Sequence, residues 1–145
     1  TFNPSVNSTT TYWAREVLNI QDNLVSTFAS NNGSGGNLWD VVNNSASLMT
    51  ITDLSGNFSA TGAVDVEFFY KPGTYVGSEF NASAWQSAGR VTVTGQGTGN
   101  ETVVLTNLSI DLPPGARFGF YMHSYSIIEF SFILLRYCYI TCNCS

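Results

Sequence analysis

The stretch AVDVEFFYKPGTYVGSEFNASAW, residues 63–85, decides the fold expected for this chain. In its first half, apolar residues occupy every second position and acidic residues stand between them, at Asp65 and Glu67. A period of two predicts a half-buried β-strand. Lys71-Pro72-Gly73 should end this strand, because proline has no N–H for the ladder and glycine accepts the positive φ of a tight turn. Phe69 interrupts the polar face, so we expect a loop or a partner to cover it.

Similar short apolar runs recur on both sides of this stretch, with turn residues between them. We expect strands at 24–29, 38–43, 47–54, 90–94, 102–110 and 118–123. Ser55-Gly56-Asn57, Gly95 to Asn100 and Pro113-Pro114-Gly115 are the predicted connections. Many short strands at fairly regular spacing predict an all-β fold, a β-sandwich or jelly roll.

The two ends of the chain do not follow this pattern. Residues 1–23 form an N-terminal arm, and the spacing of Trp13, Val17, Ile20 and Leu24 favours a short helix over 13–21, with a strand over 17–28 as the alternative. Residues 127–140 are apolar on both faces, so a strand there needs cover on both sides. It is either a central strand under the N-terminal segment or a strand that completes a neighbouring subunit. We therefore divide the chain into an arm (1–23), a sandwich (24–124) and an apolar, cysteine-bearing tail (125–145).

Charge and composition exclude several classes of partner. The 145 residues contain 5 basic and 10 acidic side chains, a net charge of -5, which argues against nucleic acid and anionic membrane surfaces. The apolar tail is shorter than the roughly 20 residues of a membrane-spanning helix. Charged residues make up only 10% of the chain, and Ser, Thr and Asn supply the polarity instead, as in secreted β-proteins. We expect a mature, extracellular or cell-surface chain without a signal peptide.

Eight asparagines open an Asn-x-Ser/Thr triplet, the acceptor for N-glycosylation. Turn-rich β-proteins are also rich in these residue types, so glycosylation depends on secretion. Of these, Asn107 falls in a predicted strand and would have to face solvent. The candidate glycosylation sites are Asn7, Asn32, Asn43, Asn57, Asn81, Asn100, Asn107 and Asn143.

Three cysteines, Cys138, Cys142 and Cys144, lie within the last eight residues. An odd number in a secreted chain leaves at least one thiol free or bonded to another chain. Two arrangements remain open: an interchain disulfide, or a local bridge from Cys138 to Cys142 or Cys144 with a spare thiol. A zinc site needs about four ligands, and only the distant His123 could join the cysteines, so we expect no metal there.

The residues that could support catalysis have simpler interpretations. His123 is the sole histidine, and no nucleophile-elbow motif accompanies it. Asp65 and Glu67 resemble a glycosidase pair only in spacing, and beside Lys71 they indicate a solvated face. Calcium on carboxylates drawn from Asp40, Asp53, Asp65, Glu67 and Asp111 stays open for an extracellular β-protein, although no loop has the usual spacing. We therefore expect no enzyme and, apart from covalent glycans and this calcium alternative, no cofactor.

Loop aromatics offer a different chemistry. Tyr75 and Trp85, with Phe80 nearby, could stack on sugar rings, although aromatic side chains more often pack into the core. A carbohydrate-binding or adhesion module is accordingly the alternative function.

The motifs YKPGTYVGSE (70–79), Ala84-Trp85, VTVT (91–94), LPPG (112–115) and Gly119-Phe120-Tyr121 resemble a family of secreted β-sandwich domains. This family occurs in cell-surface proteins of bacteria, algae and oomycete-like microbes. The resemblance covers about residues 24–124, implies a β-sandwich and carries over no catalytic residues. The arm and the tail depart from it, and with the many glycosylation triplets they resemble what subunits of glycan-coated extracellular fibrils would need.

These observations together predict a secreted, N-glycosylated, non-enzymatic structural subunit. Its partners would be copies of itself, associated head to tail by lending a terminal segment to a neighbour's sheet, and its covalent glycans. A contact of this type extends into a filament or a layer unless it closes into a ring.

Overall fold

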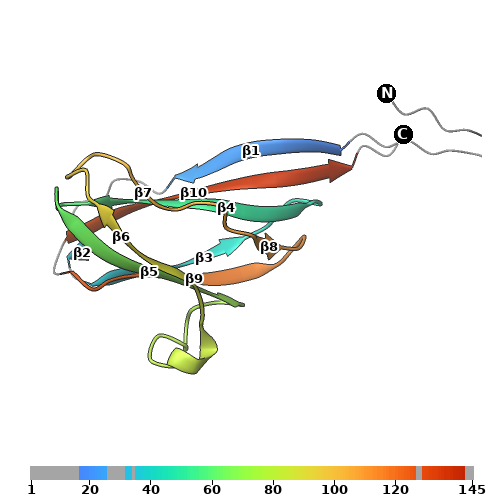
Figure 1. The fold of residues 1–145 in the computed structure, drawn as a ribbon. Helices are drawn as coiled ribbons and strands as arrows, with labels where there is room; N and C mark the ends of the chain where they lie inside the picture. Colours follow the sequence, from blue (N-terminus) through green and yellow to red (C-terminus); the bar gives the residue numbers. More distant parts are fainter. Residues whose placement is uncertain (1–16, 26–31, 34, 127–128, 143–145) are drawn as a thin grey trace, which may run out of the picture.

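The computed structural model of the chain describes residues 17–25, 32–33, 35–126 and 129–142. Its long elements are strands, which form two antiparallel sheets stacked as two layers (Figure 1). The all-β, sandwich-like fold predicted from the sequence is confirmed. The only helical element in the described residues is one 3-10 turn, η1 (Ala82–Ala84), in a loop that projects from the four-stranded layer.

The six-stranded sheet has the order β1-β10-β4-β7, with β2 paired to β10 and β8 paired to β4. Its strands are β1 (Val17–Val25), β2 (Asn32–Gly33), β4 (Leu48–Phe58), β7 (Thr102–Leu105), β8 (Ile110–Leu112) and β10 (Glu129–Cys142). The four-stranded sheet has the order β3-β9-β5-β6. Its strands are β3 (Gly36–Val42), β5 (Ala63–Pro72), β6 (Gln86–Thr94) and β9 (Arg117–Ser124).

The core lies between the two sheets. Its centre is a stack of three aromatic rings, in which the Phe68 and Phe120 centroids lie 5.6 Å apart and Trp39 lies 6.0 and 5.8 Å from them. Phe58 from the opposite sheet is also fully buried. Burying a side chain such as Phe58, Phe68 or Phe120 contributes about 1.5–3 kcal/mol, so these rings help to hold the two layers together.

The stretch at 63–85 behaves as its pattern predicts. Val64, Val66 and Phe68 are fully buried, while Asp65 and Glu67 face outward from β5. The strand ends at Pro72, and Gly73 adopts a φ of 80°, as the expected turn requires. Phe69 packs on Tyr121, beside the loop that contains η1. This loop is the partial cover that was expected over Phe69.

Two local predictions are wrong. Residues 17–21 belong to β1, so the helix over 13–21 is incorrect in its described part and the strand alternative holds from Val17 to Val25. The run 102–110 is not one strand, because Asn107 adopts a φ of 59° between β7 and β8. Pairing with a neighbouring strand overrides weak helical periodicity in the first case, and the left-handed residue breaks the ladder in the second.

The turn predicted at Ser55-Gly56-Asn57 is also wrong, because β4 continues through it to Phe58. Gly56 is needed for close packing rather than for a turn. A Cβ on this residue would lie 3.0 Å from Phe58 Cζ and 3.1 Å from Met122 Cε. Both side chains are fully buried in the core, so a methyl group at position 56 would have to displace packed neighbours by a few tenths of an ångström.

Gly56→Ala should therefore destabilise the domain by about 1–3 kcal/mol, the usual cost of overpacking a filled core. The matched control is Gly62→Ala, because a Cβ at Gly62 meets nothing within 4 Å. The measurement is the free energy of unfolding by chemical denaturation of both variants. Equal stability of the two variants would contradict this explanation of Gly56.

The tail is a strand of the sandwich. β10 lies between β1 and β4, and it pairs with β1 along the full length of that strand, from Val25↔Leu134 to Val17↔Cys142. Its pairing with β4 runs from Phe130↔Phe58 to Ile140↔Leu48. Of the two predicted arrangements, the single chain adopts the one with a central strand beside the N-terminal segment. The described parts of the arm and the tail are thus joined to the sheet that contains β4.

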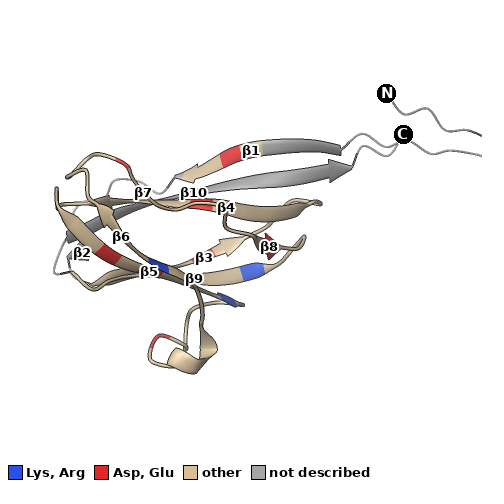
Figure 2. Ribbon diagram, in the orientation of Figure 1, with Lys and Arg blue, Asp and Glu red and all other residues tan. Residues whose placement is uncertain are grey.

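Charge is sparse over the described surface. The described basic side chains, Lys71, Arg90 and Arg117, belong to three different strands of the four-stranded sheet and form no cluster (Figure 2). Nor does the described part of the chain contain a helix long and apolar enough to cross a membrane.

Candidate functional site

The outer face of the four-stranded sheet carries a row of aromatic side chains. β5 and β9 are paired so that Glu67 lies opposite His123 and Phe69 lies opposite Tyr121. Neighbouring rings then touch along β9: Tyr121 and His123 have centroids 5.7 Å apart, and His123 and Tyr125 meet edge to face at 4.4 Å. The alternation of β9, with Phe120 and Met122 inside, places these rings outside.

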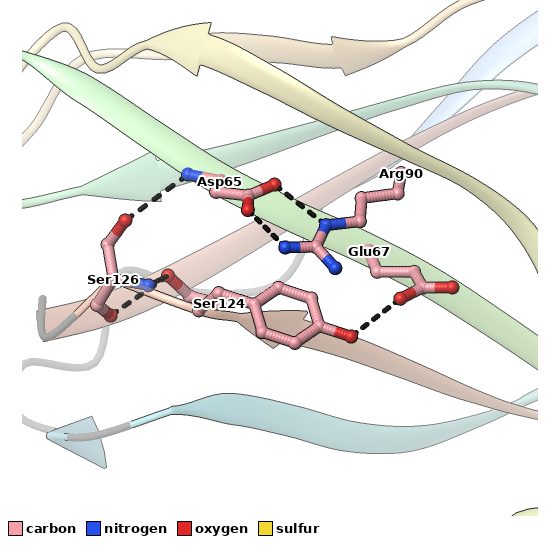
Figure 3. Close-up of polar contacts among 6 residues, drawn as sticks. Asp65, Glu67, Arg90, Ser124 and Ser126 are labelled. Carbon is pink, nitrogen blue, oxygen red and sulfur yellow. Dashed lines mark hydrogen bonds and ion pairs between the residues drawn. The ribbon is translucent and has the colours of Figure 1, made fainter.

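At one end of this row the chain leaves β9 toward β10, and polar contacts hold it there (Figure 3). The backbone N–H of Tyr125 donates to the carbonyl of Asp65 at 2.9 Å, and the N–H of Asp65 donates to Ser126 Oγ at 3.2 Å. Ser124 and Ser126 bond to each other through Ser124 Oγ, at 3.1 and 3.2 Å. These bonds hold the chain against β5 as far as Ser126, and β10 begins at Glu129.

Charged side chains strengthen the same anchor. Arg90 on β6 bonds to both carboxylate oxygens of Asp65, at 3.1 and 2.5 Å, and its guanidinium lies 3.7 Å from the centre of the Tyr125 ring. The Tyr125 hydroxyl donates to Glu67 Oε2 at 2.7 Å. We call Asp65, Glu67, Arg90, Tyr125 and Ser126 the junction cluster.

The ionisation of this cluster follows from its contacts. The hydrogen bonds from Arg90 lower the pKa of Asp65, and the Tyr125 hydroxyl, followed by Ser87, lowers the pKa of Glu67. The bond to Glu67 raises the pKa of Tyr125. Both carboxylates are therefore ionised at neutral pH and already have partners, which leaves them poorly suited to act as a glycosidase pair. The sequence predicted that Asp65 and Glu67 lie on a solvated face. It did not reveal their partners, Arg90 and Tyr125.

The other end of the aromatic row borders a pocket of about 210 Å³ between the sheet and the projecting loop. Two of its lining residues belong to the sheet, Phe69 and Tyr121. The other four belong to the loop: Glu79, Phe80, Ala82 and Trp85. We call this the aromatic pocket. Trp85 is oriented by its indole N–H, which donates to the carbonyl of Ser78 at 2.9 Å, and its ring lies 6.1 Å from that of Tyr121.

The two aromatic residues predicted to stack on sugars do not meet in this pocket. Trp85 lines it, but Tyr75 does not. Tyr75 instead lies over Gly119, where an added Cβ would be 2.7 Å from the Tyr75 nitrogen, and its N–H donates to Asp40 Oδ1. The backbone of Tyr75 therefore lies against the sheet outside the aromatic pocket, whose aromatic lining is Phe69, Phe80, Trp85 and Tyr121.

The candidate glycosylation sites fall into three groups. Asn7 and Asn143 lie outside the described residues, as does the side chain of Asn32 in β2. Asn81, Asn100 and Asn107 are exposed. Asn43 and Asn57 are 1% and 0% exposed, with Nδ2 bonded to backbone carbonyls, so the folded domain has no room for a glycan on either.

Of the three cysteines, Cys138 and Cys142 are described in their backbone only, and Cys144 lies outside the described residues. Cys138 and Cys142 belong to the same strand, β10. Four residues of extended chain separate Cα atoms by about 13 Å, beyond the roughly 7 Å that a disulfide spans. A local Cys138–Cys142 bridge is therefore incompatible with this strand.

The carboxylates considered for calcium are dispersed. Asp40 is bonded to Arg117, Thr74 and the Tyr75 N–H, and Asp111 accepts from Thr50 on β4. Among the described side chains no three His, Cys, Asp or Glu residues come together as a metal site. His123 Nδ1 pairs with the Tyr121 hydroxyl at 2.9 Å.

Comparison with known proteins adds little. Neither a family model nor a curated protein sequence matches the chain. One solved structure, titled "Structure of infectious bursal disease virus Gt strain", matches with 11% identity and a TM-score of 0.27, over 88% of this chain and 40% of that chain. A likeness this weak carries no argument, so the family resemblance seen in the motifs stays a prediction.

Proposed function

We propose that this chain is a non-enzymatic structural subunit of an extracellular glycoprotein filament or surface layer, and that its copies assemble head to tail by exchanging the C-terminal strand β10. The observation that carries the proposal is the position of β10. It is the last of the described strands, yet it lies in the interior of its sheet, between β1 and β4.

A terminal strand in this position is suited to exchange. A copy of β10 from another molecule would form the same ladders with β1 and β4, so exchange conserves the native contacts. Without β10, β4 would lose a long neighbour, and β1 would lose the only strand that it pairs with in the described residues. A sheet with such a gap recruits a matching strand, as in β-strand addition between proteins.

The junction cluster supports the same interpretation. It holds the chain to β5 as far as Ser126, and β10 begins at Glu129. Redirecting β10 to a neighbour therefore requires no change in the contacts of this cluster, and the four-stranded sheet can stay intact. Exchange in one direction, from each copy to the next, extends into a filament.

The extracellular, glycosylated part of the proposal rests on sequence composition together with exposure. Asn81, Asn100 and Asn107 present acceptor triplets on the surface of the sandwich. A glycan at these positions would cover the sides of a subunit without displacing a described strand.

Electron microscopy of the purified full chain tests assembly directly. We expect filaments or sheets that grow with protein concentration. A uniform population of monomers at every concentration would refute the proposal.

A carbohydrate-binding or adhesion module is the second candidate, and the aromatic pocket favours it. Pockets that bind small ligands are lined mainly by aromatic side chains with a few polar groups. Here Phe69, Trp85 and Tyr121 supply the rings and Glu79 the polar group. This function requires the pocket to be open to a sugar from another molecule.

A further inference from the structure

Phe80 is an unusual surface residue. Its side chain is fully exposed, at 103% of the reference value, the highest among the large hydrophobic residues described as exposed. It nevertheless lines the aromatic pocket together with Trp85, Phe69 and Tyr121. Because this ring buries almost nothing in the bare domain, its apolar surface is available to a ligand in the pocket.

The residue after Phe80 is Asn81, which opens the triplet Asn81-Ala82-Ser83, and Ala82 also lines the pocket. Asn81 is exposed, and its Oδ1 accepts a hydrogen bond from Ser83 Oγ at 2.7 Å. Its Nδ2, the atom to which an N-linked glycan is attached, has no hydrogen-bond partner among the described residues.

The other acceptor asparagines with described side chains differ in this respect. Nδ2 of Asn43 and of Asn57 donates to backbone carbonyls, as noted above. Nδ2 of Asn100 donates to the Gln96 carbonyl at 3.0 Å, and that of Asn107 to Thr106 Oγ1 at 3.4 Å. Within the described part of the chain, Asn81 thus combines exposure with an uncommitted acceptor nitrogen.

We propose that Asn81 carries an N-glycan and that the first pyranose ring of this glycan occupies the aromatic pocket of its own chain, packed against Phe80 and Trp85. Asn81 lies in the sequence between Phe80 and Ala82, which both line the pocket, so the covalent tether gives its first sugar a high effective concentration there. The volume of about 210 Å³ is below the 300–1,000 Å³ of pockets for drug-sized ligands, which suits one ring rather than an oligosaccharide.

The inference rests on the glycoprotein part of the proposed function and is independent of strand exchange. It also separates the two candidate functions, because a pocket filled by the chain's own glycan is closed to sugars from other molecules.

The test is a double-mutant cycle in one glycosylating host, with wild type, Phe80→Ala, Asn81→Gln and the combination. Mass spectrometry should find Asn81 occupied in wild type and Phe80→Ala. We expect Phe80→Ala to lower the Tm by about 2–4 °C when Asn81 is occupied, and to leave the Tm unchanged in the Asn81→Gln background. The control is Val76→Ala, which removes another exposed apolar side chain of the loop, 62% exposed, and should be neutral in both.

An unmodified Asn81, or an equal effect of Phe80→Ala in both backgrounds, overturns the proposal. A second measurement uses an array of immobilised monosaccharides. Binding that appears only when Asn81→Gln empties the pocket supports it, whereas equal binding by occupied wild type shows an open pocket and overturns it. Electron microscopy of Asn81→Gln shows whether filaments form without this glycan. The proposal for Asn81 and the proposal of strand exchange are therefore tested by different measurements.

Discussion

A Thr50→Cys chain should form a ladder of disulfide-linked multimers when assembled protein is oxidised. Thr50 on β4 lies directly opposite Cys138 on β10. Opposite residues of an antiparallel pair have Cα atoms about 4.5–5.5 Å apart, which is within disulfide geometry. If each copy receives β10 from a neighbour, every such bond joins two chains. The measurement is non-reducing gel electrophoresis, in a Cys142→Ser, Cys144→Ser background to remove competing thiols.

Two companion variants sharpen this experiment. Thr92→Cys is on β6 of the other sheet, where its register partner is Asp65, so it should give no ladder. Gln21→Cys lies opposite Cys138 on the other side of β10. Its bond links two chains if β10 alone is exchanged, and stays within one chain if β1 and β10 move together. A Thr50→Cys protein that forms only intramolecular bonds, in samples that contain filaments, would rule out exchange of β10.

Asn43→Ala should destabilise the sandwich by about 2–4 kcal/mol. Asn43 is 1% exposed, and its Nδ2 donates to the carbonyls of Ser47 and Leu112, each at 2.8 Å. Its Oδ1 accepts from the N–H and the hydroxyl of Ser45. Alanine leaves the buried Leu112 carbonyl without this partner, at about 1–3 kcal/mol, and also removes the half-buried bonds to Ser45 and Ser47. Chemical denaturation of protein made without glycosylation measures the loss.

Asn81→Ala is the matched control, because this exposed acceptor asparagine bonds only within its own loop. In unglycosylated protein it should change stability by less than about 0.5 kcal/mol. Asn43→Asp should destabilise more than Asn43→Ala, since its carboxylate would face two carbonyl oxygens. If Asn43→Ala were as stable as Asn81→Ala, Asn43 would not be a structural residue, and its exclusion as a glycan site would lose its support.

Local chemistry explains which sequence predictions are confirmed. In β5 the period-two pattern, the proline and the glycine all agree, and the structure follows them from Ala63 to Gly73. At Ser55-Gly56-Asn57, residue types that are common in turns led to a wrong prediction. Such residues can also pack and form hydrogen bonds within a strand. There Gly56 makes room for Phe58, while Ser55 Oγ and Asn57 Nδ2 bond to Glu101 and the Asn100 carbonyl. A glycine in a sequence does not reveal which of these roles it has.

The candidate site was less accessible from the sequence. Glu67 and Arg90 lie opposite each other in the register of β5 and β6, yet Arg90 bonds to Asp65. Tyr125, the residue after β9, bonds to Glu67 and stacks on the Arg90 guanidinium, and no spacing in the sequence encodes these contacts. The aromatic pocket likewise joins Phe69 and Tyr121 to a loop whose path is set by the Trp85 bond to Ser78.

By itself, the sequence determined the all-β class, the strand at 63–72, the sparse charge and the set of Asn-x-Ser/Thr triplets, because each depends on composition or on contacts between near neighbours. Only the tertiary structure decided that β10 is an interior strand, that Asn43 and Asn57 are buried while Asn81 is free, and that Trp85 rather than Tyr75 lines a pocket. These outcomes depend on which distant segments pair, and strand pairing is selected by the packing of the whole sandwich rather than by any local pattern.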